Sequence, residues 1–171
     1  MVERMGKASV YSSDWVEYDR GDLTTEQIVQ RFADNDPEIG DELKKAFTDL
    51  TDIVTKRDEA IPWIRDLRAA GYQVLYLSNF SKQALEGCPE AMAFIEETDG
   101  GILSYRDHVV KPGHEIYKLL EERFGLTPEK TVFIDDTPVN IDAAKELGWN
   151  GIVYKSYEQA VNELHELGVR Y

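Results

Sequence analysis

The strongest constraint on the fold is a short apolar run that ends in two adjacent aspartates. The three residues Val132–Ile134 favour β structure and predict a fully buried strand, which Asp135 and Asp136 follow directly. A turn and a short helix come next, and Gly148 can end that helix. Ligands of open α/β sheets bind at the carboxyl ends of the strands, and Mg²⁺ prefers oxygen ligands, so the two acids are candidates for a metal site. They could equally be caps of the helix that follows, and this segment alone favours neither alternative.

Two other segments place polar residues directly after a strand pattern or directly before a helical pattern. Val74–Leu77 is a second buried-strand pattern, and Ser78 and Asn79 come directly after it. Further along, Lys111 and Pro112 precede a helical pattern. An apolar strand ending in serine, then Lys-Pro, then an apolar strand ending in two aspartates resembles the haloacid dehalogenase-like hydrolases. The combination of the three motifs is specific, whereas each alone is weak.

The resemblance runs from about Ser13 to the end of the chain, and it is closest to the family's phosphatases with a small helical cap. It implies an α/β fold, a Rossmann-like parallel sheet with helices on both faces. Alternating strand and helix patterns in the second part of the chain indicate the same class. We therefore expect a helical cap region over residues 1–55 and an α/β core over residues 56–171.

The resemblance also implies roles for the residues after the last strand and for the lysine. Asp136 would bind Mg²⁺ directly, and Asp135 would order the waters of the metal or the neighbouring loop. Asn140 would lie in the next layer around the metal, or it could simply be a residue that satisfies free N–H groups at the start of a helix. Lys111 would hold the nucleophilic aspartate and the phosphate close together.

Ser78 and Asn79 complete the phosphate site that the resemblance implies. The hydroxyl of Ser78 would donate to a phosphate oxygen, with the backbone N–H of Asn79 beside it. The alternative is a serine that merely ends a strand. The expected substrate is a small phosphorylated metabolite, and the expected cofactor is Mg²⁺.

One motif of the family has no counterpart in this chain. The family's first strand ends in Asp-x-Asp, whose first aspartate attacks phosphorus and whose second is the general acid. Residues 1–12 contain no apolar run and no aspartate, and neither Asp14 nor Asp19 follows a buried strand. We therefore expect this chain alone to be inactive, either as a truncated enzyme or as a non-catalytic pseudoenzyme that binds phosphate or metal.

The missing strand would be the central one, between the serine strand and the Asp-Asp strand. The sheet should then contain a gap between Val74–Leu77 and Val132–Ile134, unless another segment fills it. The local candidate is Ala8–Ser12, and the alternative is a strand from a second copy, which would make the protein a homo-oligomer.

Composition restricts the partners and the compartment. The net charge of −14 argues against a nucleic-acid partner, since phosphate backbones require a basic surface. No apolar stretch reaches the length of a membrane span, and no signal-peptide pattern opens the chain. Cys88 is the single cysteine, so no internal disulfide forms and the cytoplasm is expected. Cys88 is a poor candidate nucleophile because no histidine lies near it in the sequence.

Several local signals predict individual elements. Thr24 and Ser156 each open a capping box that should begin a helix. Cys88–Glu97 is predicted to be helical, and Ile102–Val110 should contain one or two short strands.

Overall fold

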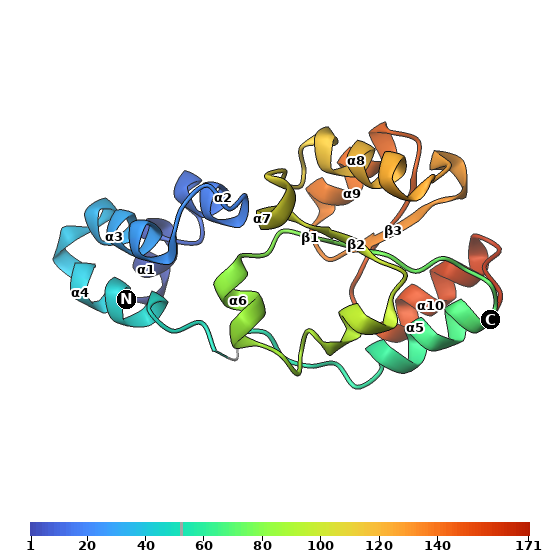
Figure 1. Cartoon of the computed structure of the whole chain (residues 1–171), viewed down its shortest axis with the longest axis horizontal. Helices are drawn as coiled ribbons and strands as arrows, with labels where there is room; N and C mark the ends of the chain where they lie inside the picture. The colour runs from blue at the N-terminus through green and yellow to red at the C-terminus, as the bar shows by residue number, and fades with distance from the viewer. Residues whose placement is uncertain (52) are drawn as a thin grey trace. The chain divides into compact units, whose positions relative to one another are not determined.

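The computed structural model describes residues 1–51 and 53–171 (Figure 1). Its helices are α1 (Val2–Ala8), α2 (Ser13–Asp19), α3 (Thr25–Asn35), α4 (Gly40–Phe47), α5 (Ala60–Ala69), α6 (Lys82–Gly87), α7 (Ser104–Asp107), α8 (His114–Phe124), α9 (Pro138–Glu146) and α10 (Tyr157–Glu166). Its strands are β1 (Tyr76–Ser78), β2 (Gly101–Leu103), β3 (Val132–Asp135) and β4 (Asn150–Val153). Short 3₁₀ helices cover Pro37–Ile39, Ala93–Glu97 and Pro128–Lys130. None of the described helices is long and apolar enough to cross a membrane.

The chain divides into two compact units. The first contains Met1–Lys56, Ser78–Ala93 and Leu103–Val110, and the second contains Arg57–Leu77, Phe94–Ile102 and Lys111–Tyr171. The first unit thus combines the segment expected to be a cap with two later segments. The role of residues 1–55 as a cap stays a prediction.

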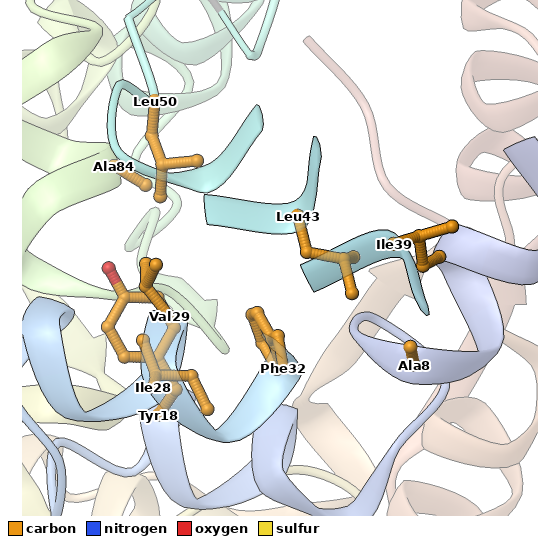
Figure 2. Close-up of a cluster of buried hydrophobic side chains, with 9 residues drawn as sticks. All are labelled: Ala8, Tyr18, Ile28, Val29, Phe32, Ile39, Leu43, Leu50 and Ala84. Atoms are coloured by element: carbon orange, nitrogen blue, oxygen red, sulfur yellow. The ribbon is translucent and has the colours of Figure 1, made fainter. Parts of the chain in front are cut away.

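The first unit is built around an apolar cluster of helical side chains, shown in Figure 2. Thr24 begins α3 with the predicted capping box, because its hydroxyl accepts from the N–H of Gln27 and the Gln27 side chain accepts in return. This start directs Ile28 and Phe32 inward, and both are almost completely buried. The cluster consists of Ala8, Tyr18, Ile28, Val29, Phe32, Ile39, Leu43, Leu50 and Ala84.

The second unit is an α/β layer structure, as predicted. β3 and β4 pair in parallel, with Val132 opposite Asn150 and Asp135 opposite Val153. Figure 1 shows α8 and α9 on one side of the strands and α5 and α10 on the other. Ile141 of α9 and Ile152 of β4 are almost completely buried. The helix-on-both-faces arrangement follows from parallel strands joined through helices.

β1 and β2 form a separate two-stranded sheet. The strand predicted at Val74–Leu77 begins later, at Tyr76, whose N–H donates to the carbonyl of Gly100. Gly101 lies so close to this strand that a β-carbon at its position would be 2.1 Å from the carbonyl oxygen of Tyr76. The expected topology requires a gap between β1 and β3, and among the described residues these two strands do not pair.

Two local predictions are wrong. Ala8–Ser12 is not a strand: α1 ends at Ala8, and a turn follows in which Ser9 donates its hydroxyl to the carbonyl of Met5. Cys88–Glu97 is not one helix, because Pro89 restricts the residue before it and α6 ends at Gly87. The prediction of one or two short strands in Ile102–Val110 is confirmed for one strand, because β2 ends there with Ile102 and Leu103 before α7 begins.

Candidate functional site

A buried ion pair lies at the carboxyl ends of two strands in the second unit. The ammonium of Lys111 is 2.6 Å from Oδ2 of Asp135, and the two side chains are only 10% and 7% exposed. The same ammonium donates to the carbonyl oxygen of Leu77 at 2.9 Å. Lys111 therefore connects the end of β1 to the end of β3. A buried charge pair with this geometry is held because each charge left alone in the interior would be costly.

Asp135 is engaged through both of its carboxylate oxygens. While Oδ2 accepts from Lys111, Oδ1 accepts from the backbone N–H of Thr137 at 2.8 Å and from Nδ2 of Asn140 at 3.1 Å. The backbone carbonyl of Asp135 extends the pairing of β3 with β4 by accepting from the N–H of Tyr154. Asp135 thus fixes the loop between β3 and α9 and orients the lysine. Its expected part in ordering the waters of a metal or the neighbouring loop of a metal site stays a prediction.

Asp136 has a different environment, although it is the next residue. It is exposed, and its Oδ1 accepts only from the hydroxyl of Thr137 at 3.3 Å. Its other oxygen has no hydrogen-bond partner in the described part of the chain. Of the two adjacent aspartates, Asp136 is therefore the one with an oxygen available to a cation. No group of three or more His, Cys, Asp or Glu side chains suited to a metal gathers among the described residues.

Asn140 is buried and points back to the ion pair. It is the third residue of α9, is 8% exposed, and donates to Asp135. Its own carbonyl accepts from the hydroxyl of Tyr117 at 2.8 Å. The side chain of Asn140 therefore supports Asp135 and makes no capping bond to the backbone at the start of α9.

Tyr117 was not singled out from the sequence. It lies on α8 and is completely buried, and burial raises the pKa of its phenol, with a further contribution from the charge of Asp135. In the sequence it falls within an apolar helical stripe, which gives no sign that its hydroxyl reaches the next helix. The only usable signal is chemical, because a buried tyrosine usually needs a hydrogen-bond partner.

Ser78 and Asn79 belong to the first unit. Ser78 is the last residue of β1 and is half-buried, and its hydroxyl has no hydrogen-bond partner within residues 1–51 and 53–171. Asn79 follows at once and is also half-buried. Their binding of a phosphate oxygen stays a prediction.

Neither aspartate near the N-terminus resembles an available nucleophile. Asp14 accepts hydrogen bonds from Arg31 at 3.2 Å and from Asn35 at 2.8 Å. Asp19 is buried at the end of α2. Both lie on a helix rather than after a strand.

Comparison with known proteins agrees with this architecture. The profile of the haloacid dehalogenase-like hydrolase family matches residues 3–148. Acyl-CoA dehydrogenase family member 10 of Mus musculus is 29% identical over 91% of this chain and 15% of that protein. Flavin mononucleotide hydrolase 1 of Arabidopsis thaliana is 22% identical over 91% of this chain and 62% of that protein. The chain therefore spans less than two thirds of either relative.

A solved structure shows the same fold. A haloacid dehalogenase family enzyme from Bacteroides thetaiotaomicron, in a magnesium complex, superposes with a TM-score of 0.74 at 23% identity, covering 95% of this chain and 88% of that one. Together with the family match over most of the sequence, these similarities show that the chain belongs to the haloacid dehalogenase-like hydrolase family.

Proposed function

We propose that this chain carries the metal and phosphate site of a Mg²⁺-dependent phosphatase that acts on small phosphorylated metabolites. The observation that carries the proposal is the buried pair of Lys111 and Asp135 beside the exposed Asp136. The ion pair holds the Lys111 ammonium in a fixed position at the end of a strand, where ligands of α/β folds bind. The adjacent carboxylate is free to bind a metal.

The residues fit a weakly held magnesium ion. Mg²⁺ usually takes one or two protein carboxylates and keeps several waters, and Asp136 supplies one carboxylate with an unengaged oxygen. When bound, Mg²⁺ neutralises negative charge on phosphoryl oxygens. The chain's own contribution is to orient, because Asp135 holds the Lys111 ammonium in place.

Asp136 provides the test of the metal site. Asp136→Asn should weaken Mg²⁺ binding about tenfold, because the site loses its only unengaged carboxylate among the described residues. Asp142→Asn is the matched control, since Asp142 is an exposed carboxylate further along α9. Isothermal titration of both variants with MgCl₂ measures the difference. Equal affinities would refute the assignment of Asp136.

Catalysis by this chain alone is not expected. Phosphoryl transfer to an aspartate needs the nucleophile and the general acid together, and no Asp-x-Asp follows a strand in this sequence. Purified residues 1–171 should therefore hydrolyse p-nitrophenyl phosphate or flavin mononucleotide no faster than the buffer with Mg²⁺. Turnover that depends on both Mg²⁺ and Asp136 would refute this prediction and require a search for a substitute carboxylate, with Asp14 examined first.

A second candidate function uses the same residues without chemistry. A pseudoenzyme would bind phosphate and metal and act as a regulatory protein, with the Lys111–Asp135 pair and Asp136 in the same positions. The two functions differ in one experiment: adding a strand that ends in Asp-x-Asp to the N-terminus should produce phosphatase activity if the site is otherwise competent. If the remaining residues no longer support the chemistry, the same addition should leave the chain inactive although it still binds phosphate and Mg²⁺.

A further inference from the structure

Tyr117 is a buried polar residue with no part in the proposed function. We propose that Tyr117 is a positioning residue, which fixes the Lys111–Asp135 ion pair through two separate contacts. The inference deepens the proposed function, but it concerns the geometry of the pair and can be tested without metal or substrate.

The first contact runs through hydrogen bonds. The Tyr117 hydroxyl donates to the carbonyl of Asn140 at 2.8 Å, and the amide of the same Asn140 donates to Oδ1 of Asp135 at 3.1 Å. Asn140 is thus held at its backbone by α8 while its side chain holds Asp135. Because the pKa of the Tyr117 phenol is raised by burial, the hydroxyl keeps its proton and remains a donor at neutral pH.

The second contact runs through aromatic rings. The rings of Tyr117 and Phe133 pack edge to face, with centroids 5.6 Å apart. The Lys111 ammonium lies 5.5 Å from the centroid of the same Phe133 ring. Trp149 packs against both rings, at 5.6 Å from Tyr117 and 6.1 Å from Phe133, so the Phe133 ring has little freedom to move.

These two contacts act on opposite partners of one ion pair. The hydroxyl of Tyr117 reaches Asp135 through Asn140. The ring of Tyr117 packs against the Phe133 ring, over which the Lys111 ammonium lies. A charge pair that is this buried depends on good geometry, since a small displacement loses attraction without restoring hydration. A residue that constrains both partners is therefore suited to set how the Lys111 ammonium is presented at the strand ends.

The test separates the hydroxyl from the ring. Tyr117→Phe keeps the ring and removes only the donor to Asn140, and Tyr18→Phe is the control, because Tyr18 is a buried tyrosine of the first unit whose hydroxyl donates to Gln83 at 2.8 Å. NMR of the metal-free full chain would follow the ¹³Cε resonance of Lys111 and the ¹³Cγ resonance of Asp135. Both resonances should shift in Tyr117→Phe and stay in place in Tyr18→Phe.

Unchanged Lys111 and Asp135 resonances in folded Tyr117→Phe would overturn the proposal, even if the variant were less stable, because a merely structural role lowers stability without moving the pair. If Tyr117→Phe does not fold, 3-fluorotyrosine at position 117 keeps the hydroxyl but makes it a stronger donor to Asn140, and the Lys111 and Asp135 resonances should again shift. A Mg²⁺ titration is the second readout, with affinity reduced up to about tenfold in Tyr117→Phe. Absence of Mg²⁺ binding in the unmodified chain would overturn the proposed function and leave the resonance test intact.

Discussion

At the scale of single residues, the site depends on the different environments of two adjacent aspartates. Asp135 continues the strand and has both carboxylate oxygens engaged, while Asp136 is exposed and has one oxygen unengaged within the described residues. The pattern in the sequence predicts that two acids lie at a strand end. It cannot tell which of them is buried, because that depends on where the side chain of Lys111 goes.

The same reasoning explains what the sequence could not predict about the site. Lys111 and the two aspartates stand out because charged residues follow apolar runs. Tyr117 does not stand out, because an aromatic residue on a helix normally packs in the core, and the hydroxyl contact depends on how α8 and α9 lie together. Long-range partners of this kind are set by tertiary packing rather than by local pattern.

The buried ion pair makes a prediction about stability. Lys111→Met should lower the free energy of unfolding by about 3 kcal/mol, because Asp135 would remain buried without its cation. Lys118→Met, a change at an exposed lysine of α8, should alter it by no more than about 0.5 kcal/mol. Urea unfolding followed by circular dichroism compares the two variants. Similar losses in both would mean that the pair adds nothing specific to stability.

At the scale of elements, the sequence predicts best where a local signal decides the structure. The capping boxes at Thr24 and Ser156 begin α3 and α10 as predicted, since both side chains needed for each box are within three residues. β3 appears where three apolar residues precede the aspartates. β1 is shorter than its apolar run, because pairing with β2 decides where a strand begins, and a pattern of single residues does not contain that information.

One carboxylate links three segments of the second unit and should make stability depend on pH. Asp99 accepts from the N–H of Val74 at 2.9 Å and from Arg68 at 3.0 Å, and these contacts, the Val74 N–H above all, lower the pKa of Asp99. A carboxylate whose pKa is lower in the folded state stabilises the fold above its unfolded pKa of about 3.9, and this stabilisation is lost as the pH falls through the folded value.

We therefore predict that Asp99→Asn is less stable than the unmodified chain at pH 7 but not in strong acid. The difference at pH 7 should be about 1 kcal/mol, reduced by the partial exposure of the group to solvent, and it should shrink as the pH falls below the unfolded pKa of about 3.9. Thermal unfolding at a series of pH values measures it, with Asp142→Asn as the exposed control. A difference that stays constant from pH 7 to pH 2 would show that the charge of Asp99 contributes nothing.

At the scale of the whole molecule, the second unit leaves backbone groups of β1 and β3 unpaired with another strand. The backbone groups of Val74 and Tyr76 form hydrogen bonds with the segment that leads into β2. Because backbone groups alternate in direction along a strand, those of Leu77 face the opposite edge, where the Leu77 carbonyl accepts from Lys111. The carbonyls of Thr131 and Asp135 face β4, so Val132 and Ile134 face away. Within the described residues these strand edges pair with no strand, which makes them sites where another extended segment can add.

Two opposing effects then set the state of the chain in solution. The net charge of −14 makes copies repel one another, while open strand edges favour association. Salt shortens the range of the repulsion, from about 30 Å at 0.01 M to about 3 Å at 1 M, and leaves backbone hydrogen bonding intact. We predict that the average mass measured by sedimentation stays near 19.5 kDa at low salt and rises at high salt with increasing protein concentration.

Val132→Pro tests whether the strand edge is responsible for this association. Val132 is the first residue of β3, where proline is tolerated, and the preceding Thr131 is already extended with φ −101° and ψ 133°. The substitution removes one N–H from the open edge and leaves the bonds of Thr131 and Asp135 to β4 in place. The variant should therefore associate less than the unmodified chain at high salt. Equal masses for the two proteins at every salt concentration would show that the open edge of β3 is not an association surface.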